Sequence, residues 1–346
     1  MDVRRPVATL DEVALTAGVS RATVSRVVNR TRNVAPDIQQ AVLKAIAATG
    51  YVPNRAARSL RTQQIGSVAL VVCSADNGSP DAQRLPRSLT DPYVGRLMGG
   101  ALAALQALDV RLELLFVDNP DPREALVGRL LRRDVDGVLL VSVHTEDPLP
   151  PMVAGTGRPA VLIGHPARPV GMSVVDVEQG AGAGLAAAAL LDRGCRSLAV
   201  IAGPEKSPGA NQRLSGFIDA VTARGGGEVT VASGDLTIHS GERAMIGLLD
   251  RRPSVDGVFA ANDRMAQGAL LALRERGRAV PGEIAVVGFD DGPNATGSRP
   301  LLTTVRQPLE EMAAEAVRLL MEQVQAVPPK GRTVLFAPTL VVRESA

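Results

Sequence analysis

One stretch near the start, Thr9 to Asn29, constrains the fold most, because its pattern allows little besides two short helices joined by a tight turn. Thr9-Leu-Asp-Glu12 has the form of a capping box, in which the Thr and Glu side chains satisfy backbone amides at a helix start. Gly18 can adopt a positive φ and end this helix sharply, and Ser20 is placed to cap a second helix that runs to about Asn29. The stretch predicts a helix-turn-helix unit.

The predicted second helix has an apolar side and a polar side. Val24, Val27 and Val28 share one helix face and would pack on the first helix. On the other face, an Arg could bind guanine, a small Ala could meet a thymine methyl, and hydroxyl or amide groups could hold phosphates. The alternative is a solvated polar face on an ordinary helical hairpin. The candidate DNA-contacting residues are Thr9, Ser20, Arg21, Ala22, Thr23, Ser25, Arg26 and Asn29.

Residues 36–49 predict a third helix, which ends at Gly50 and completes a small core. A fourth helix starting after Asn54 would have only about seven residues, too few to persist alone in water. Its three Arg residues and one large apolar residue, Leu60, suit a segment that orders in the minor groove and inserts a leucine between base steps. A linker whose Leu60 packs on the next domain is the alternative. The candidate contacts here are Asn54, Arg55, Ala57 and Leu60.

Four segments of this region resemble the DNA-binding head and hinge helix of the LacI/GalR family of bacterial transcription regulators. They are Gly18-Val-Ser20, Thr23-Val-Ser-Arg26-Val-Val-Asn29, Gly50-Tyr51-Val-Pro53-Asn54 and Ala57 to Leu60. The resemblance implies that Arg21, Ala22 and Arg26 read operator DNA and that Leu60 opens the central step of a palindromic site. Ala35 departs from the family, which usually has Ser or a similar cap there. The missing cap would cost about 1 kcal/mol.

Charge is distributed unevenly along the 346-residue chain. Residues 1–62 carry ten Lys and Arg against four Asp and Glu, whereas the rest carries 28 against 32. A basic head on a mildly acidic body is expected when only the head meets phosphates. The length suits a small head and a larger body. We predict a helix-turn-helix domain at 1–51, a hinge helix at 52–62 and an effector-binding and dimerisation domain at 63–346.

Other features exclude several classes of protein. Cys73 and Cys195 are too few and too far apart for a disulfide framework or a metal site, so a reducing interior is expected. The sequence has no run of about 18 apolar residues and no secretion signal, which predicts a cytoplasmic protein without membrane contact. We find no metal-ligand cluster and no persuasive catalytic arrangement, so no metal, cofactor or catalytic residue is expected.

From Ile65 onward, short apolar runs alternate with amphipathic stretches, the pattern of parallel strands joined by crossover helices. The expected strands are Val68–Cys73, Arg111–Phe116, Gly137–Ser142, Ala160–Gly164, Leu198–Ala202, Val255–Ala260 and Ile284–Phe289. The expected helices are about Tyr93–Leu108, Arg123–Arg132, Gln179–Arg193, Gln212–Arg224, Gly241–Asp250, Met265–Arg276 and Leu309–Gln325. Seven strands exceed one comfortable sheet. We therefore predict an α/β body of two doubly wound parallel-sheet lobes facing each other across a cleft.

The resemblance covers this body as well, whose fold the family shares with periplasmic sugar-binding proteins. It implies that the chain crosses between the lobes about Val175, about Val305 and near Val334. The N-lobe would comprise 63–175 and 306–333, and the C-lobe 176–305 and 334–346. Three crossings make a hinge. Its closure on a small molecule would change how two bodies in a dimer hold their heads.

The cleft candidates are residues that follow predicted strands or open helices: Tyr93, Arg213, Asn262, Asp263 and Asp290. By resemblance, Arg213 occupies the family position that grips the effector. A carboxylate and a guanidinium that converge can hold paired hydroxyls in fixed directions, as sugar recognition requires, and Tyr93 could supply a ring face. Asn262 and Asp263 could equally be turn and cap residues.

Some roles stay open. Gln179 begins a helix where many family members have Asn, and His144 and His165 follow strands, where each could touch ligand or be merely solvated. Asp76 to Thr90 could form a lid or an unstructured insertion. Gly182-Ala-Gly184-Leu-Ala-Ala187, with Glu205 downstream, fits a dinucleotide-binding pattern, but such small residues also let a helix pack closely on a sheet.

The preferred hypothesis is a homodimeric repressor of carbohydrate-utilisation genes, controlled by a sugar in the cleft. A purine-type co-repressor would use the same cleft, and an α/β nucleotide-dependent enzyme with a DNA-binding head is the other alternative. No leucine heptads follow the strand-like residues 339–343, which favours a dimer over a tetramer.

Overall fold

The structure is a computed structural model that describes residues 8–28, 34–51, 64–73, 90–117, 120–141, 144–166, 168–325 and 331–346. The chain forms two compact units, Met1–Ile65 and Gly66–Ala346. The predicted hinge helix, with Asn54, Arg55, Ala57 and Leu60, lies outside the described residues. So do Asn29 and nearly all of the Asp76–Thr90 segment.

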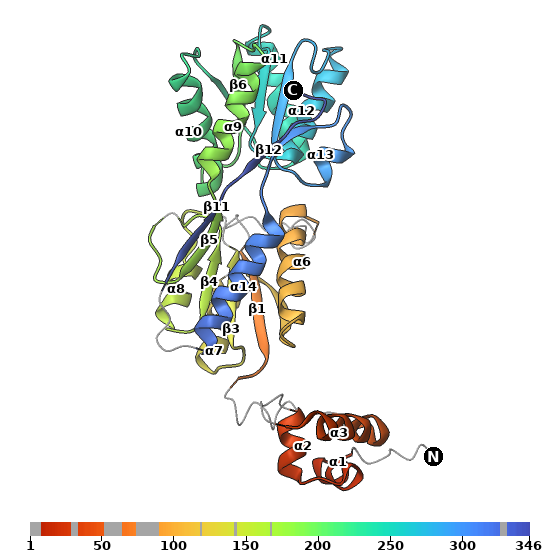
Figure 1. The fold of residues 1–346 in the computed structure, drawn as a ribbon. Coiled ribbons are helices and arrows are strands. Elements are labelled where there is room, and N and C mark those ends of the chain that lie inside the picture. The colour runs from red at the N-terminus through yellow and green to blue at the C-terminus, as the bar shows by residue number, and fades with distance from the viewer. Residues whose placement is uncertain are drawn as a thin grey trace, which may run out of the picture. The chain divides into compact units, whose positions relative to one another are not determined.

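In the first unit the described residues form three helices, α1 (Leu10–Ala17), α2 (Arg21–Val28) and α3 (Pro36–Thr49) (Figure 1). The capping box is present, since Thr9 N donates to Glu12 Oε2 at 2.8 Å and Glu12 N donates to Thr9 Oγ1 at 3.3 Å. Gly18 ends α1 with a φ of 66°, and Ser20 Oγ accepts a hydrogen bond from Thr23 N at the start of α2. The predicted helix-turn-helix unit is confirmed.

A small apolar core joins the three helices. Its members come from the predicted inward faces: Val13, Ala14, Val24, Val42 and Ala45 are buried, and Val27, Val28, Ile38 and Ile46 pack around them. The first residue of α3 is Pro36, and Ala35 before it provides no side-chain cap hydrogen bond. The backbone amides at this helix start therefore lack the side-chain partner that Thr9 provides for α1.

The second unit contains two six-stranded sheets. Sheet A has the order β11-β5-β4-β3-β1-β2 and sheet B the order β12-β10-β9-β8-β6-β7. Neighbouring strands are parallel except β10 and β12, which are antiparallel. The strands of sheet A are β1 (Ser67–Cys73), β2 (Arg111–Val117), β3 (Gly137–Val141), β4 (Ala160–Ile163), β5 (Ser173–Val177) and β11 (Thr333–Phe336). Those of sheet B are β6 (Leu198–Ala202), β7 (Thr230–Ser233), β8 (Gly257–Ala260), β9 (Ala285–Asp290), β10 (Thr303–Arg306) and β12 (Thr339–Val341).

The prediction of two parallel-sheet lobes is confirmed, and all seven expected strands form, but that set was incomplete. The additional strands are β5, β7, β10, β11 and β12, the last of which lies in the stretch described above as strand-like. Each has only three to five residues, and β7 and β11 alternate between exposed and less exposed positions. Both lie at or near sheet edges, where a strand has no need of a continuous apolar run.

Helices cover both faces of each sheet (Figure 1). On sheet A, α6 (Pro92–Gln106) and α14 (Leu309–Gln325) lie side by side on one face, and α7 (Pro120–Leu131) and α8 (Leu149–Gly155) cover the other. On sheet B, α9 (Gln179–Asp192) and α10 (Pro208–Ala223) cover one face. The opposite face carries α11 (Ile238–Arg251) and α12 (Asp263–Glu275), with the short α13 (Pro293–Gly297) beside α12.

The chain passes between the sheets three times: after β5, between β10 and α14, and between β11 and β12. The crossings were expected about Val175, about Val305 and near Val334. Val175, Val305 and Val334 each lie inside a strand, because pairing continues to Val177 in β5, to Arg306 in β10 and to Phe336 in β11. The N-lobe, built on sheet A, therefore includes residues 176–177 and 334–336.

The run of small residues in α9 has a packing explanation. A Cβ on Gly182 would lie 2.8 Å from the Phe289 ring, and a Cβ on Gly216 of α10 would lie 2.5 Å from Cα of Gly180. The pattern from Gly182 to Ala187 thus lies within a helix that packs tightly on sheet B and on α10. It does not form a phosphate-binding turn at a strand end.

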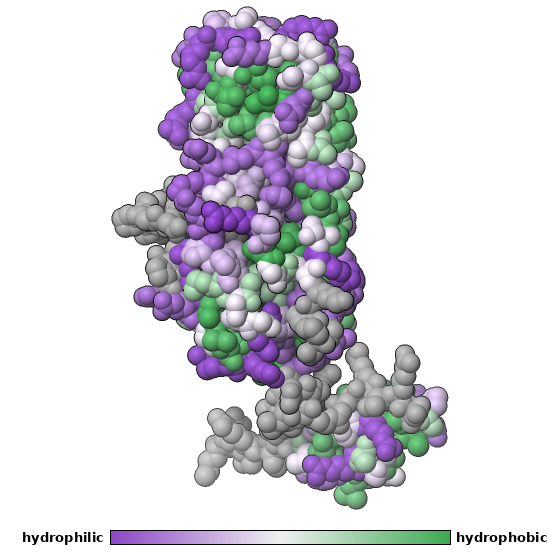
Figure 2. Space-filling view, turned by 90° about the vertical axis from the view of Figure 1, so that its left-hand side faces the viewer, coloured by the Kyte–Doolittle hydropathy of each residue, from purple (hydrophilic) through white to green (hydrophobic). Residues whose placement is uncertain are grey.

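Figure 2 shows one side of the molecule, on which hydrophilic residues predominate and hydrophobic residues form separate patches. Within the described ranges, no helix is both long enough and apolar enough to cross a membrane.

Candidate functional site

Helix α2 directs a polar side to solvent. Arg21, Ala22 and Arg26 are exposed, whereas Val24 is fully buried in the core. Arg21 Nη1 lies 3.6 Å from Asp11 Oδ2 in a pair whose side chains are 67% exposed, so this contact holds the Arg only weakly. Thr23 and Ser25 are partly exposed beside them, while Thr9 and Ser20 serve as helix caps. A second helix with this solvent-exposed polar face has the form of a groove-reading helix.

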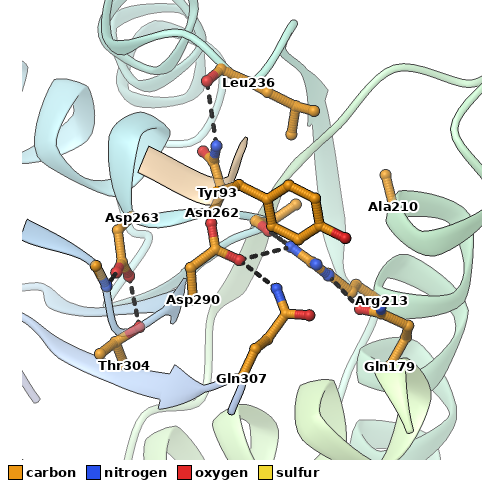
Figure 3. Close-up of polar contacts among 12 residues, drawn as sticks. Tyr93, Gln179, Ala210, Arg213, Leu236, Asn262, Asp263, Asp290, Thr304 and Gln307 are labelled. Atoms are coloured by element: carbon orange, nitrogen blue, oxygen red, sulfur yellow. Dashed lines mark hydrogen bonds and ion pairs between the residues drawn. The ribbon is translucent and has the colours of Figure 1, made fainter. Parts of the chain in front are cut away.

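The effector candidates come together from both lobes at the carboxyl ends of strands. Asp290 ends β9, Arg213 lies on α10, and Tyr93 is in the first turn of α6 from the N-lobe. Figure 3 shows these side chains directed toward one region together with Gln179 and Gln307. The carboxyl ends of parallel strands are where ligands bind in open α/β folds.

Arg213 is 9% exposed and is held in a fixed orientation by several contacts. Its Nε donates to Gln179 Oε1 at 2.7 Å, and its Nη1 donates to the carbonyl oxygen of Ala261 at 2.5 Å. Nη1 also lies 3.4 Å from Asp290 Oδ1. The guanidinium carbon is 3.8 Å from the ring centroid of Phe289, in cation–π geometry. These contacts from four residues hold the guanidinium in one orientation.

Asp290 carries the acidic counterpart on an unusual backbone. Its φ of 115° lies in the left-handed region, which costs energy for a residue with a side chain. Oδ1 accepts a 2.6 Å hydrogen bond from Gln307 Nε2. Burial raises the pKa of Asp290 to about 6, although the Arg213 guanidinium and the Gln307 hydrogen bond oppose the rise. Gln307 itself is fully buried, and its Oε1 has no hydrogen-bond partner among the described residues.

Asp176, on β5, is a further cleft residue that sequence analysis did not single out. Its Oδ1 accepts hydrogen bonds from Gln179 Nε2 at 2.9 Å and from Val177 N at 2.8 Å. Its Oδ2 is buried without a hydrogen-bond partner in the described part of the chain, and His165 Nδ1 lies 3.7 Å away. Burial raises the pKa of Asp176. A charged residue inside an otherwise apolar strand was the signal that could have identified it.

Asn262 and Asp263 make contacts of the kind expected for cap and turn residues, the alternative given above. Asn262 Oδ1 caps α12 by accepting from Met265 N, and its Nδ2 donates to the carbonyl oxygen of Leu236. Asp263 Oδ2 accepts from Gly292 N at 2.8 Å, and Oδ1 accepts from Thr304 Oγ1 at 2.5 Å. Each of these four side-chain atoms already has a protein partner. Both residues therefore have structural roles at the carboxyl end of sheet B, and their contact with an effector stays a prediction.

The remaining candidates are His165, His144 and Tyr93, which have different surroundings. His165 Nε2 lies 2.9 Å from Gln212 Nε2 on α10, so this ring joins the N-lobe to the C-lobe. His144 Nδ1 accepts a 3.3 Å hydrogen bond from Glu146 N within its own turn. Burial raises the pKa of the Tyr93 hydroxyl above its usual range, which keeps it a neutral hydrogen-bond donor. In the described ranges no group of three or more His, Cys, Asp and Glu could hold a metal ion.

Known protein families match both compact units of the chain. Residues 9–54 match the model of bacterial regulatory proteins of the lacI family, and residues 187–346 match the periplasmic binding protein-like domain. The HTH-type transcriptional regulator CelR of Thermobifida fusca is 41% identical over 349 residues, which cover 99% of this chain and 98% of that protein. The chain belongs to the LacI family of bacterial transcription regulators.

Solved structures of LacI-family proteins share the whole architecture. A complex of the regulator CelR with cellobiose has a TM-score of 0.74 at 38% identity, covering 99% of this chain and 100% of that one. A lac repressor dimer bound to operator and the anti-inducer ONPF has a TM-score of 0.78 at 26% identity, covering 98% and 99%. This LacI-family chain is a DNA-binding transcription regulator and not an enzyme, which settles the alternative left open by the glycine pattern.

Proposed function

We propose that this LacI-family regulator is a repressor of carbohydrate-utilisation genes that binds a palindromic operator as a homodimer and responds to a small neutral sugar between its lobes. As a reader of operator DNA it would act in the cytoplasm. The observation that carries the proposal is Oδ2 of Asp176, which is buried beside the network that holds Arg213 and has no hydrogen-bond partner among the described residues.

The chemistry of this cleft favours a ligand with hydroxyl groups. Asp176 Oδ2 and Gln307 Oε1 are both buried acceptors without a hydrogen-bond partner among the described residues, and each such group costs about 1–3 kcal/mol until a donor reaches it. Sugar hydroxyls supply donors in several directions and can also accept from Arg213. A flat purine offers few N–H donors, all in its ring plane.

The charges of the cleft disfavour an anionic effector. Two carboxylates, Asp176 and Asp290, face one guanidinium, Arg213, and all three side chains are less than one-fifth exposed. A sugar phosphate would add negative charge to a region in which the carboxylates already outnumber the cations. The CelR relative was solved with cellobiose, so cellobiose is the first sugar to test here.

A thermal-shift screen tests the proposal with the full-length protein against cellobiose, other mono- and disaccharides, sugar phosphates, purines and NAD. A ligand at about a hundred times its dissociation constant should add about 2.7 kcal/mol to the native state. We expect a raised unfolding midpoint with a neutral sugar, and the same sugar should change operator affinity measured by fluorescence anisotropy. A shift with purines alone would support the co-repressor alternative, and no shift with any saccharide would contradict the proposal.

A pair of variants links the response to the cleft. Asp176→Asn replaces the carboxylate whose Oδ2 lacks a hydrogen-bond partner among the described residues, so the sugar-induced shift should fall strongly. Asp192→Asn makes the same chemical change on the exposed end of α9, where the side chain is 69% exposed, and should leave the shift intact. Equal shifts in both variants would remove Asp176 from the site. Sedimentation velocity on the same samples tests the proposed homodimer.

A further inference from the structure

Arg96 lies behind the proposed effector site, on α6 of the N-lobe. Its guanidinium forms a bidentate ion pair with Glu310, with Nε to Oε1 and Nη2 to Oε2 both at 2.7 Å. Glu310 is in the first turn of α14, so this pair ties together the two helices on one face of sheet A. Charge-assisted bidentate pairs of this kind fix both distance and direction.

The same guanidinium reaches the ends of two C-lobe strands. Nη1 donates to the carbonyl oxygen of Asp290 at 2.9 Å and lies 3.4 Å from that of Asp291, and Nη2 donates to the carbonyl oxygen of Gln307 at 3.3 Å. Asp290 and Gln307 are the residues whose side chains join each other beside Arg213. Two residues thus present their side chains to the cleft and their carbonyl oxygens to Arg96.

We propose that Arg96 is the positioning residue that couples occupancy of the cleft to the placement of α6, and through it to operator affinity. This inference rests on the proposed effector response. A ligand that displaces the side chain of Asp290 or Gln307 shifts the backbone of the same residue. Arg96 then carries the shift to α6, because its five N–H donors are rigidly arranged in one plane.

The strand end that Arg96 contacts has a constrained backbone, and a cavity beside the guanidinium gives it space to move. Asp290 and Asp291 have φ values of 115° and 53°, so this strand end has few alternative conformations. On its outer side, Arg96 lines a cavity of about 510 Å³ whose wall includes Arg306, Pro308 and Glu311. The guanidinium can therefore move with the strand end without displacing a packed core.

Helix α6 also has a path toward the head. Val94, Leu97 and Ala101 of α6 share an apolar core with Val68 and Leu70 of β1, which is the first strand after the head. Packed cores transmit small displacements because they deform little. A movement of α6 imposed by Arg96 therefore reaches the strand to which the head is joined.

A purely structural role for Arg96 would consist of its pair with Glu310. Two variants separate the roles, because Glu310→Gln weakens the ion pair but leaves the carbonyl contacts available, whereas Arg96→Gln removes both. Arg96→Lys keeps the charge but cannot span Glu310 and three carbonyl oxygens. Arg318→Gln is the matched control, because the ion pairs of Arg318 in the described part of the chain are to Glu315 and Glu322 on its own helix α14.

The test measures operator affinity by anisotropy with and without saturating cellobiose, and cellobiose affinity by calorimetry, for each full-length variant. The wild-type ratio of the two operator dissociation constants should lie in the usual range of about 5–150-fold. We expect the ratio to fall to within about twofold of unity in Arg96→Gln and Arg96→Lys, with cellobiose affinity largely retained. Glu310→Gln and Arg318→Gln should stay near the wild-type ratio. A wild-type ratio in Arg96→Gln, or equal losses in Arg96→Gln and Glu310→Gln, would overturn the inference.

If the wild-type protein does not respond to cellobiose, cellobiose is not its effector, and Arg96 is then tested without a ligand. Operator affinity is then measured for Asp290→Asn, Arg96→Gln and the double variant without ligand. Coupling through Arg96 predicts that the effect of Asp290→Asn shrinks several-fold when Arg96 is absent. Strictly additive effects, including no effect of Asp290→Asn alone, would overturn the inference. Thermal midpoints of the variants confirm that each one is folded.

Discussion

The guanidinium of Arg213 donates a 2.7 Å hydrogen bond to Oε1 of Gln179, the residue at which α9 begins. Nε2 of Gln179 in turn donates to Asp176 at the end of sheet A, so one amide side chain joins a C-lobe cation to an N-lobe carboxylate. The first crossing of the chain between the lobes therefore runs through the proposed effector site. A ligand bound there acts directly on the hinge.

Replacing Arg213 by Lys should abolish the effector response. A single ammonium cannot reach Gln179, Ala261 and Asp290 with the planar geometry of a guanidinium. We expect sugar affinity measured by calorimetry to fall at least about 100-fold, equivalent to about 2.7 kcal/mol. Arg224→Lys, at the exposed end of the same helix, is the control and should bind sugar normally. Normal sugar binding by Arg213→Lys would exclude Arg213 from the site.

Sugar affinity should depend on pH through Asp290. Its pKa is about 6 in the ligand-free protein, so it is mostly protonated at pH 5 and mostly ionised above pH 7. If the sugar binds the ionised form, binding below pH 6 must displace a proton, and affinity should fall by up to about tenfold per pH unit as pH falls. Calorimetry between pH 5 and 8 measures this slope. Asp290→Asn should flatten it, and a flat wild-type profile would contradict the assignment.

Folding stability should show the opposite dependence on pH. The folded-state pKa of Asp290 is raised above the unfolded value of about 3.9, so the folded protein binds more protons between about pH 4 and 6. The stability contributed by protonated Asp290 is therefore lost as pH rises through this window, by up to about 3 kcal/mol. Asp176 and Asp263 shift in the same direction, so the test is the difference between urea unfolding of the wild type and of Asp290→Asn.

In the head, Arg26→Gln should weaken operator binding. Arg26 is exposed on the polar side of α2, and a lost bidentate contact to a base costs about 1–3 kcal/mol. Anisotropy titrations on operator and on random DNA distinguish base reading from phosphate contact, because only base reading predicts a larger loss on operator. Arg318→Gln, far along the sequence on α14, should change neither affinity. Equal losses on both DNAs would assign Arg26 to the phosphates.

Gly216→Ala should destabilise the effector domain by about 1–3 kcal/mol, since its new methyl would lie 2.5 Å from the backbone of Gly180. Gly184→Ala is the matched control in the same helix pair, because its Cβ would meet Ala220 at an ordinary 3.7 Å. The control should be neutral or stabilising by up to about 1 kcal/mol. Urea unfolding of the full chain measures both changes, and similar values for the two variants would argue against tight packing of α9 on α10.

The head was the most predictable part of the chain, because its signals act over a few residues. The reciprocal hydrogen bonds of Thr9 and Glu12, the left-handed backbone of Gly18 and the inward spacing of Val24 and Val28 each depend on near neighbours alone. The longer strands were equally clear, since a strand covered on both faces needs an unbroken apolar run. The short strand β7 and the edge strand β11 lack such a run and escaped prediction.

The sequence alone therefore determined the helix-turn-helix unit and the α/β class of the body, and it predicted that Arg213 and Asp290 contact an effector. Only the tertiary structure decided which polar groups meet. Asp263 and Asp290 are both acidic residues near strand ends, yet Thr304 and Gly292 occupy one and Arg213 faces the other. Arg96 and Glu310 are 214 residues apart. Such partners are brought together by sheet order and helix packing, which depend on the burial of the whole core and leave no mark in the residues around either one.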